Sequence, residues 1–155
     1  MYILARFTAY AERACGMPSR FIDYVSHATG KPFEIEHIWP DDYTRFTDQF
    51  NSPQEFASYR NRLGGLILLP RGFNQSLGAD DYSHKVVAYF GQNLLAKTLA
   101  DPCYRNNPTF LAFRQSTGLA FKPYAVFDKQ ALEERQDLYR ELAERVWSPD
   151  RLHAQ

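Results

Sequence analysis

The amino-acid sequence predicts an α+β fold that is mainly helical, with two short strands held in a helical scaffold. Residues 33–40 alternate apolar and polar side chains and end at a proline, as a half-buried strand does. Residues 66–69 form a short, fully apolar run closed by Pro70, which is typical of a buried strand. The rest of the chain largely shows apolar residues at helical spacing, between helix start and stop signals.

The composition indicates one folded domain over residues 1–155. A chain of 155 residues can bury a real core, and 45% hydrophobic and 15% aromatic residues exclude a disordered protein. The formal net charge of zero argues against a uniformly basic nucleic-acid-binding surface but leaves room for a local basic patch.

The two cysteines, Cys15 and Cys103, lie far apart in the sequence and in no zinc-binding or redox spacing. We therefore expect neither a disulfide framework nor a zinc knuckle, and a reducing compartment fits best. No apolar run approaches membrane-spanning length, and the N-terminus lacks the apolar region of a signal peptide. These features predict a soluble cytoplasmic domain.

Before the first strand, the spacing predicts a helix over residues 2–15, ended by Gly16 and Pro18, and a short helix over residues 20–28. The first helix begins almost at the first residue without a cap, so we expect that the chain was cut from something longer.

Between and after the strands, residues 41–52 are expected to form a loop. Ser52, Pro53 and Glu55 form a helix start with a capping box, and this helix is predicted to run to about residue 62. Residues 71–78 are expected to form a turn or a single helical turn, and a longer helix is predicted over residues 81–99.

The last third of the chain is predicted to be helical. Asn107 and Pro108 begin a helix that runs to about Thr117, and Asp128 caps a final helix that runs to Trp147. The sequence shows no repeat and no clear linker, so one domain is the simplest interpretation.

Glu36 and His37 form an acid–histidine pair at the end of the first strand. Side chains alternate along a regular strand, but where the chain turns at Pro40 both can face one site. A histidine that titrates near neutrality, beside a carboxylate that could hold a cation, is compatible with a hydrolytic centre. Taken alone, such a pair is more often a surface pair or a structural histidine.

The order of the downstream elements strengthens the hydrolytic interpretation. Two short strands can pair and pack one helix, which would bring Glu36, His37 and Asn74 around one cation. Phosphodiester hydrolysis needs a base for water and a hard cation for the phosphate and the leaving oxygen. Outside this context, Asn74 is most simply a turn residue and Lys85 a solvated helix residue.

Several ordered motifs resemble the C-terminal HNH-type nuclease domain of GmrSD-like modification-dependent restriction enzymes. The resemblance rests on Glu36–Pro40, Arg62–Leu69, Asn74 and Lys85, in that order. It extends to the predicted N-terminal helix and to the last helix, with Arg135, Leu138, Ala143 and Trp147, and so covers nearly the whole chain.

The resemblance implies a ββα-metal core within about residues 33–90, flanked by helices within 1–30 and 91–150. His37 would be the general base, while Glu36 and Asn74 would bind Mg²⁺ or Mn²⁺; Asn74, at the start of the motif helix, would complete the catalytic site. Lys85, with Arg62 and Arg71 as neighbours, would contact the phosphate backbone of DNA. Products would carry 5′-phosphate ends.

The family's full-length members also carry an N-terminal ParB-like sensor or NTPase domain, so the chain is expected to be the C-terminal part of a longer protein. Its expected role is that of an endonuclease or nickase, the effector of a bacterial restriction or anti-phage system that acts on phage or modified DNA.

One residue departs from the family's pattern, because Gly65 stands where the family usually has asparagine. If a backbone carbonyl makes the contact that orients the catalytic histidine, glycine could still provide it, but with greater conformational freedom. The alternative function is therefore a catalytically weak or silent DNA-binding module that retains the HNH fold. A third alternative is a helical interaction domain in which the Glu36–His37 pair is accidental.

Overall fold

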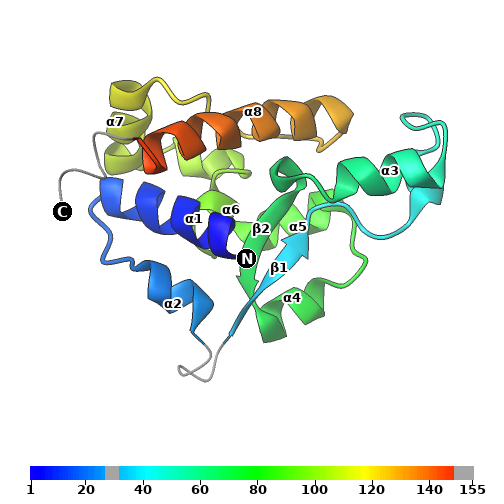
Figure 1. The fold of residues 1–155 in the computed structure, drawn as a ribbon, viewed down its shortest axis with the longest axis horizontal. Helices are drawn as coiled ribbons and strands as arrows, with labels where there is room; N and C mark the ends of the chain where they lie inside the picture. Colours follow the sequence, from blue (N-terminus) through cyan, green and yellow to red (C-terminus); the bar gives the residue numbers. More distant parts are fainter. Residues whose placement is uncertain (27–31, 149–155) are drawn as a thin grey trace.

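The computed structural model describes residues 1–26 and 32–148 (Figure 1). Within these residues the α-helices are α1 (Tyr2–Ala14), α2 (Phe21–Val25), α3 (Pro53–Arg60), α4 (Arg71–Leu77), α5 (Tyr82–Tyr89), α6 (Leu94–Lys97), α7 (Pro108–Thr117) and α8 (Lys129–Val146). The strands are β1 (Phe33–His37) and β2 (Leu66–Pro70), and the short 3₁₀ helices are η1 (Tyr43–Phe46), η2 (Leu63–Gly65) and η3 (Asp101–Tyr104). The prediction of a mainly helical protein with a small two-stranded sheet is confirmed.

The two strands pair antiparallel, and α4 follows β2 directly. The register sets Phe33 opposite Pro70 and His37 opposite Leu66. Helix α4 packs on both strands, so β1, β2 and α4 form one compact unit (Figure 1). The segment between the strands, which includes α3, forms one end of the molecule.

Strand β2 separates two hydrophobic cores. Leu66 and Leu68 belong to the cluster that contains Phe7 of α1, which we call the α1 core. Ile67 and Leu69 belong to the cluster around the buried indole of Trp39, which we call the Trp39 core. Because both faces of β2 are buried, its sequence is apolar at successive positions rather than alternating.

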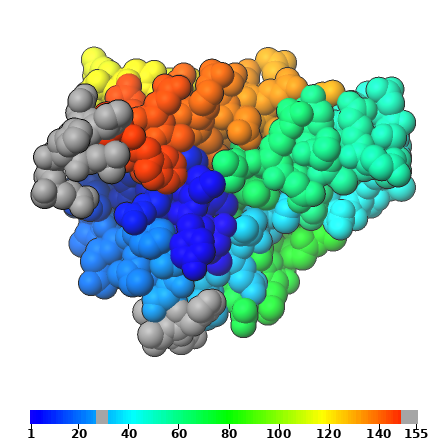
Figure 2. Space-filling model, viewed as in Figure 1, coloured from blue at the N-terminus to red at the C-terminus, as the bar shows by residue number. Residues whose placement is uncertain are grey.

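The turn before β2 packs tightly beneath α8. A Cβ atom added at Gly64 would lie 2.5 Å from the carbonyl oxygen of Leu132 and 2.6 Å from the backbone nitrogen of Gln136. The backbone N–H of Gly64 also donates to the Gln136 side chain at 2.8 Å. Figure 2 shows α8 (orange) lying directly against the green part of the chain that includes η2. Glycine is therefore required at position 64 by the closeness of this helix.

Side-chain caps mark the start of two of the predicted helices, α3 and α8. Ser52 accepts a hydrogen bond from the backbone of Glu55 at 3.1 Å, and Asp128 accepts one from Ala131 at 2.8 Å. The Glu55 carboxylate accepts from the backbone N–H of Asn51 at 2.9 Å, so the capping box closes one residue earlier than expected.

Some element boundaries differ from the prediction. Helix α3 ends at Arg60. Helix α4 has two turns where a turn or a single helical turn was expected. The loop over residues 41–52 contains η1. Of the helix predicted over residues 20–28, the structure has α2, while residues 27 and 28 lie outside the described part of the chain.

The single helix predicted over residues 81–99 is wrong, because the chain breaks between α5 and α6. Asn93 caps α6 by accepting from Ala96 at 3.2 Å, and its amide also donates to the carbonyl of Leu68 in β2. The backbone N–H of Leu94 donates to the buried carboxylate of Glu12 at 3.0 Å. These distant partners replace the hydrogen bonds that a continuous helix would have made. No helix in the described residues combines the length and apolar character needed to cross a membrane.

Candidate active site

A pocket of about 360 Å³ opens where β1 ends. Its walls come from the end of β1 and the turn after it, the last residue of α3, helix α4 and the connection to α5. Its charged and polar side chains are those of Glu36, His37, Asp41, Arg60, Asn74 and Lys85. Three residues that were predicted to share a site, Glu36, His37 and Asn74, therefore line one pocket although they are far apart in sequence.

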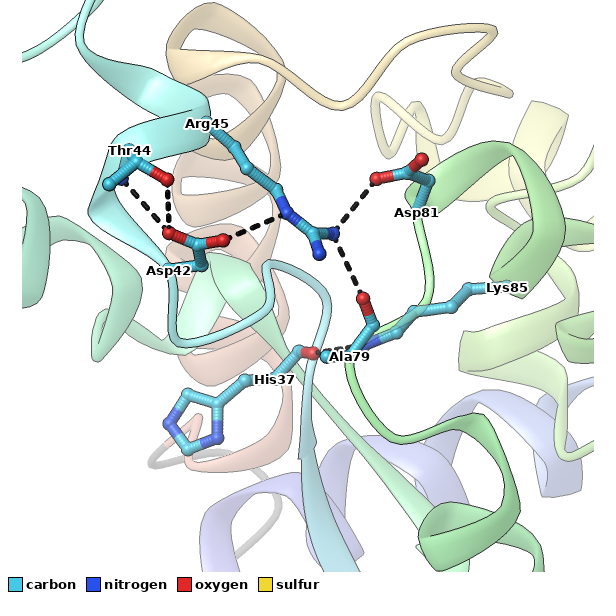
Figure 3. Close-up of polar contacts among 7 residues, drawn as sticks. All are labelled: His37, Asp42, Thr44, Arg45, Ala79, Asp81 and Lys85. Atoms are coloured by element: carbon cyan, nitrogen blue, oxygen red, sulfur yellow. Dashed lines mark hydrogen bonds and ion pairs between the residues drawn. The ribbon is translucent and has the colours of Figure 1, made fainter.

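Glu36 points into the protein and forms a buried network. Its Oε1 atom accepts hydrogen bonds from Lys85 Nζ at 2.8 Å and from the Tyr89 hydroxyl at 2.7 Å. Lys85 also donates to the backbone carbonyl of His37 at 3.1 Å (Figure 3). Burial, followed by the charge of Glu36, raises the pKa of Tyr89, so this hydroxyl remains a donor. The network fixes the end of β1 to α5.

Lys85 was predicted to contact DNA, and its side chain is only 1% exposed. Its ammonium is committed to Glu36 and to the backbone of His37. The sequence gives no signal for this pairing, because the partner, Glu36, is 49 residues away. Lysine is rarely buried unless it is paired, so burial of Lys85 was not expected.

The imidazole of His37 is oriented by Asn61, which follows α3. Its Nε2 atom lies 3.0 Å from Asn61 Oδ1, while Asn61 Nδ2 donates to the carbonyl of Ala57 at 2.9 Å. The amide is thereby oriented with its oxygen toward the ring. A carbonyl oxygen only accepts, so the neutral imidazole carries its proton on Nε2 and has its lone pair on Nδ1. Sequence reasoning missed Asn61, which carries no signal beyond that of a residue at a helix end.

The surroundings of His37 favour its neutral form. Burial lowers the pKa of His37 most, and the positive charge of Arg60 lowers it further. The hydrogen bond with Asn61 and the charges of Glu36 and Asp41 act in the opposite direction without reversing the shift. A neutral imidazole is the form that can accept a proton.

Arg45 fixes the rim of the pocket from outside. Its Nη1 atom donates to the carbonyl of Ala79 at 2.9 Å and to Asp81 at 3.0 Å, and its Nε atom donates to Asp42 at 3.1 Å (Figure 3). These bonds join the loop after β1 to the connection between α4 and α5. In Figure 3 the ring of His37 points away from this cluster.

The other two predicted DNA-contacting residues lie outside the pocket. The guanidinium of Arg62 stacks on the ring of Tyr59, 3.6 Å from its centroid. Arg71 forms an ion pair with Glu34 at 2.6 Å, and its side chain remains 54% exposed. Both are on the surface, but neither lines the pocket.

Glu36 and Asn74 could supply two oxygen ligands to a cation. Within the described residues, Glu36 Oε2 accepts no hydrogen bond, and the amide of Asn74 uses only Nδ2, which donates to Ile35 O at 3.4 Å. One carboxylate and one amide oxygen fit a hard cation that keeps several waters. The described residues contain no group of three or more histidine, cysteine and acidic side chains that could hold a metal ion. Both candidate donors are hard oxygen atoms rather than nitrogen or sulfur ligands.

Comparison with known proteins identifies the class. The sequence matches, over residues 2–142, the family model described as the C-terminal domain of GmrSD restriction endonucleases. A match over this much of the chain makes the protein a restriction-endonuclease domain, which implies a nuclease role in restriction and DNA as the substrate. The chain belongs to the family of GmrSD C-terminal domains, as the sequence motifs predicted. No curated protein and no solved structure matches it.

Proposed function

We propose that this domain is a divalent-metal-dependent DNA endonuclease or nickase of the HNH type, with β1, β2 and α4 as its ββα-metal core. The observation that supports this most directly is that His37, with Nε2 bonded to Asn61, shares one pocket with Glu36 and Asn74. The proposal includes a role as a cytoplasmic effector in a bacterial restriction or anti-phage system.

His37 would act as the general base. With Nε2 hydrogen-bonded to Asn61, the lone pair on Nδ1 can take a proton from a water molecule that attacks the phosphodiester. The lowered pKa of His37 leaves the ring unprotonated near neutral pH, so no prior deprotonation is needed. Asn61 would be a positioning residue that keeps the basic nitrogen fixed.

Glu36 and Asn74 would hold the metal ion. When bound, Mg²⁺ or Mn²⁺ would neutralise charge on the phosphate and on the departing oxygen. Lys85 reduces the net negative charge beside Glu36, so we expect metal binding to be weak until the phosphates of DNA add negative charge.

Nicking of supercoiled plasmid with Mg²⁺ or Mn²⁺ tests the proposal. We expect the parent chain to nick, EDTA to stop the reaction, and His37→Ala and Asn74→Ala each to reduce the rate by at least about a hundredfold. His84→Ala, an exposed histidine of α5 outside the pocket, is the matched control and should retain the parent rate.

Equal nicking by the parent, His37→Ala and Asn74→Ala would contradict the proposal, because the activity would then come from a contaminant. The proposal also includes an N-terminal ParB-like sensor or NTPase domain that would direct cutting to modified or phage DNA. The coding sequence upstream of Met1 tests that part directly.

A silent DNA-binding module remains the second candidate, and the Lys85–Glu36 pair favours it because one carboxylate oxygen is already occupied. This candidate predicts that the parent chain binds DNA but leaves plasmid intact with either metal. Nicking that His37→Ala abolishes would exclude it.

A further inference from the structure

The pocket contains two pairs, each of one cationic and one anionic side chain, and the pairs differ in distance and in exposure to solvent. Lys85 and Glu36 lie 2.8 Å apart, with side chains 1% and 7% exposed. Arg60 and Asp41 are 4.0 Å apart, with side chains 16% and 83% exposed. The first pair is a buried contact, whereas the second is loose and its acid lies almost entirely in water.

Arg60 is held in place from behind. Its Nε atom donates to the backbone carbonyl of Trp39 at 3.1 Å. Trp39 is itself fixed, since its indole N–H donates to the carbonyl of Phe127 at 2.6 Å and its ring lies in the Trp39 core. The guanidinium of Arg60 is therefore anchored by one nitrogen, and its two terminal nitrogens make no hydrogen bond within residues 1–26 and 32–148.

A guanidinium with free terminal N–H groups fits an oxyanion. Arginine presents its donors as a planar fork that matches two phosphate oxygens, and a hydrogen bond between charged groups is shorter and stronger than a neutral one. Because Asp41 is so exposed, it can turn into water with little loss and leave Arg60 to an incoming anion. Arg60 also lies close enough to His37 for its charge to act on the imidazole.

We propose that Arg60 binds the phosphate group of DNA next to His37, and that Asp41 holds the guanidinium only while DNA is absent. This inference rests on the proposed function and adds the residue that places the phosphate in the pocket. It assigns that role to Arg60 rather than to Lys85, whose ammonium is already committed to Glu36.

The test measures DNA binding separately from cleavage. In a His37→Ala background with Mg²⁺, the dissociation constant for a fluorescent duplex is measured by anisotropy over a range of salt concentrations. Arg60→Gln should weaken binding by about tenfold and lower the slope of log K against log salt by about one. Arg60→Lys should keep the slope and lose part of the affinity, because it keeps the charge but not the fork.

Asp41→Asn gives the discriminating result. If Arg60 binds phosphate, removing the competing and repelling carboxylate should tighten DNA binding severalfold, opposite in sign to Arg60→Gln. If the two residues formed only a structural pair, both substitutions would change binding in the same direction. Arg140→Gln, an exposed arginine of α8 outside the pocket, is the control for loss of one charge and should stay within about twofold.

Binding by Arg60→Gln equal to that of Arg140→Gln, or weakened binding by Asp41→Asn, would overturn the proposal. If Arg60→Gln loses its fold because the bond to Trp39 is lost, Arg60→Lys and Asp41→Asn decide the question. Failure of this inference can be told apart from failure of the proposed function, which fails if the parent chain binds DNA and does not cut it.

Discussion

His37 combines a fixed tautomer with a lowered pKa, and each property comes from a different neighbour. Asn61 decides which nitrogen carries the proton, while burial and the charge of Arg60 decide how readily the ring gains a second one. These effects can be separated experimentally because they respond to different substitutions.

The pH dependence of nicking should show the lowered pKa of His37. We expect the rate to rise with pH through a midpoint below the ordinary value of 6.5, because the neutral ring is the active form. Asp41→Asn should move this midpoint lower still, since the charge of Asp41 raises the pKa. A midpoint above 6.5 in the parent chain would contradict the structure's account of this histidine.

The same shift predicts how His37 affects stability. A histidine whose pKa is lower in the folded state binds fewer protons there than in the unfolded chain, so its contribution rises with pH through the interval between the two values. This contribution is present above about pH 6.5 and is lost as the pH falls through the folded-state value. Urea unfolding of the parent chain and of His37→Gln across this interval should show the extra slope only in the parent.

The Glu36–Lys85 pair should matter to folding as much as to chemistry. Glu36→Ala leaves a buried ammonium without its counter-ion, which should lower the free energy of unfolding by about 3–5 kcal/mol. The double variant Glu36→Gln with Lys85→Met removes both charges and should lose less. Arg140→Ala breaks an exposed pair with Asp137 and should change stability by less than about 0.5 kcal/mol, which makes it the control in urea titrations.

At the scale of the elements, the short helix η2 packs against α8 and leads directly into β2, so it couples α8 to the sheet that carries the site. Gly64→Ala should lower the free energy of unfolding by about 1–3 kcal/mol or more, because the new methyl group would meet the backbone of α8. Gly72→Ala in α4 is the matched control, since a Cβ there meets nothing within 4 Å, and it should be neutral or stabilise by up to about 1 kcal/mol. Thermal or urea unfolding of both variants measures the difference. Equal losses of unfolding free energy in the two variants would show that η2 is not tightly packed.

Gly65, where the resemblance led us to expect asparagine, is explained in part by the same packing. A Cβ at this position would lie 3.1 Å from a methyl group of Leu132 and 3.2 Å from the carbonyl of Arg60. Its own carbonyl accepts from the backbone N–H of Ile38 at 2.9 Å and so extends the pairing past His37. Glycine here allows α8 to approach the end of the sheet.

The sequence predicted those elements whose signals are local. Ser52, Asp128 and the pair Asn107–Pro108 each mark a helix start within a few residues, and the helices begin where these residues predicted. The break between α5 and α6 has a local signal, since Gly91 and the cap residue Asn93 stand at it, but the bonds that hold it run from Asn93 and Leu94 to β2 and α1, at least 25 residues away. The prediction of one helix gave too little weight to Gly91 and Asn93.

The candidate site shows the same division between local and distant information. That Glu36, His37 and Asn74 share a pocket followed from the order of strands and helix. The roles of Asn61 and Arg60 did not, because each depends on a contact across the fold: Asn61 with His37, and Arg60 with the turn at Trp39.

At the scale of the whole molecule, β2 contributes side chains to both cores, so we expect the two cores to unfold as one cooperative unit. Each core has one tryptophan in it or against it: Trp39 lies in its own core, and the exposed Trp147 is edge-on to Phe7 of the α1 core, at 5.7 Å between ring centroids. We expect Trp147→Phe, which leaves Trp39, and Trp39→Phe, which leaves Trp147, to unfold in one transition each. In each variant, the fluorescence and far-UV circular dichroism midpoints in urea should coincide. Separate midpoints in either variant would show that the cores unfold independently.

Because neither face of β2 is polar, its side chains give little preference for one alignment with β1 over the next. The alignment therefore depends on what holds the ends of β2: the glycine turn under α8 and the bond from Arg71 N–H to Pro32 O at 2.9 Å. A slip of one residue would carry α4, and with it Asn74, about 3.4 Å along the sheet. A screen for variants that lose DNA restriction should therefore return substitutions at Leu132 and Gln136 in α8, outside the pocket, alongside those at His37.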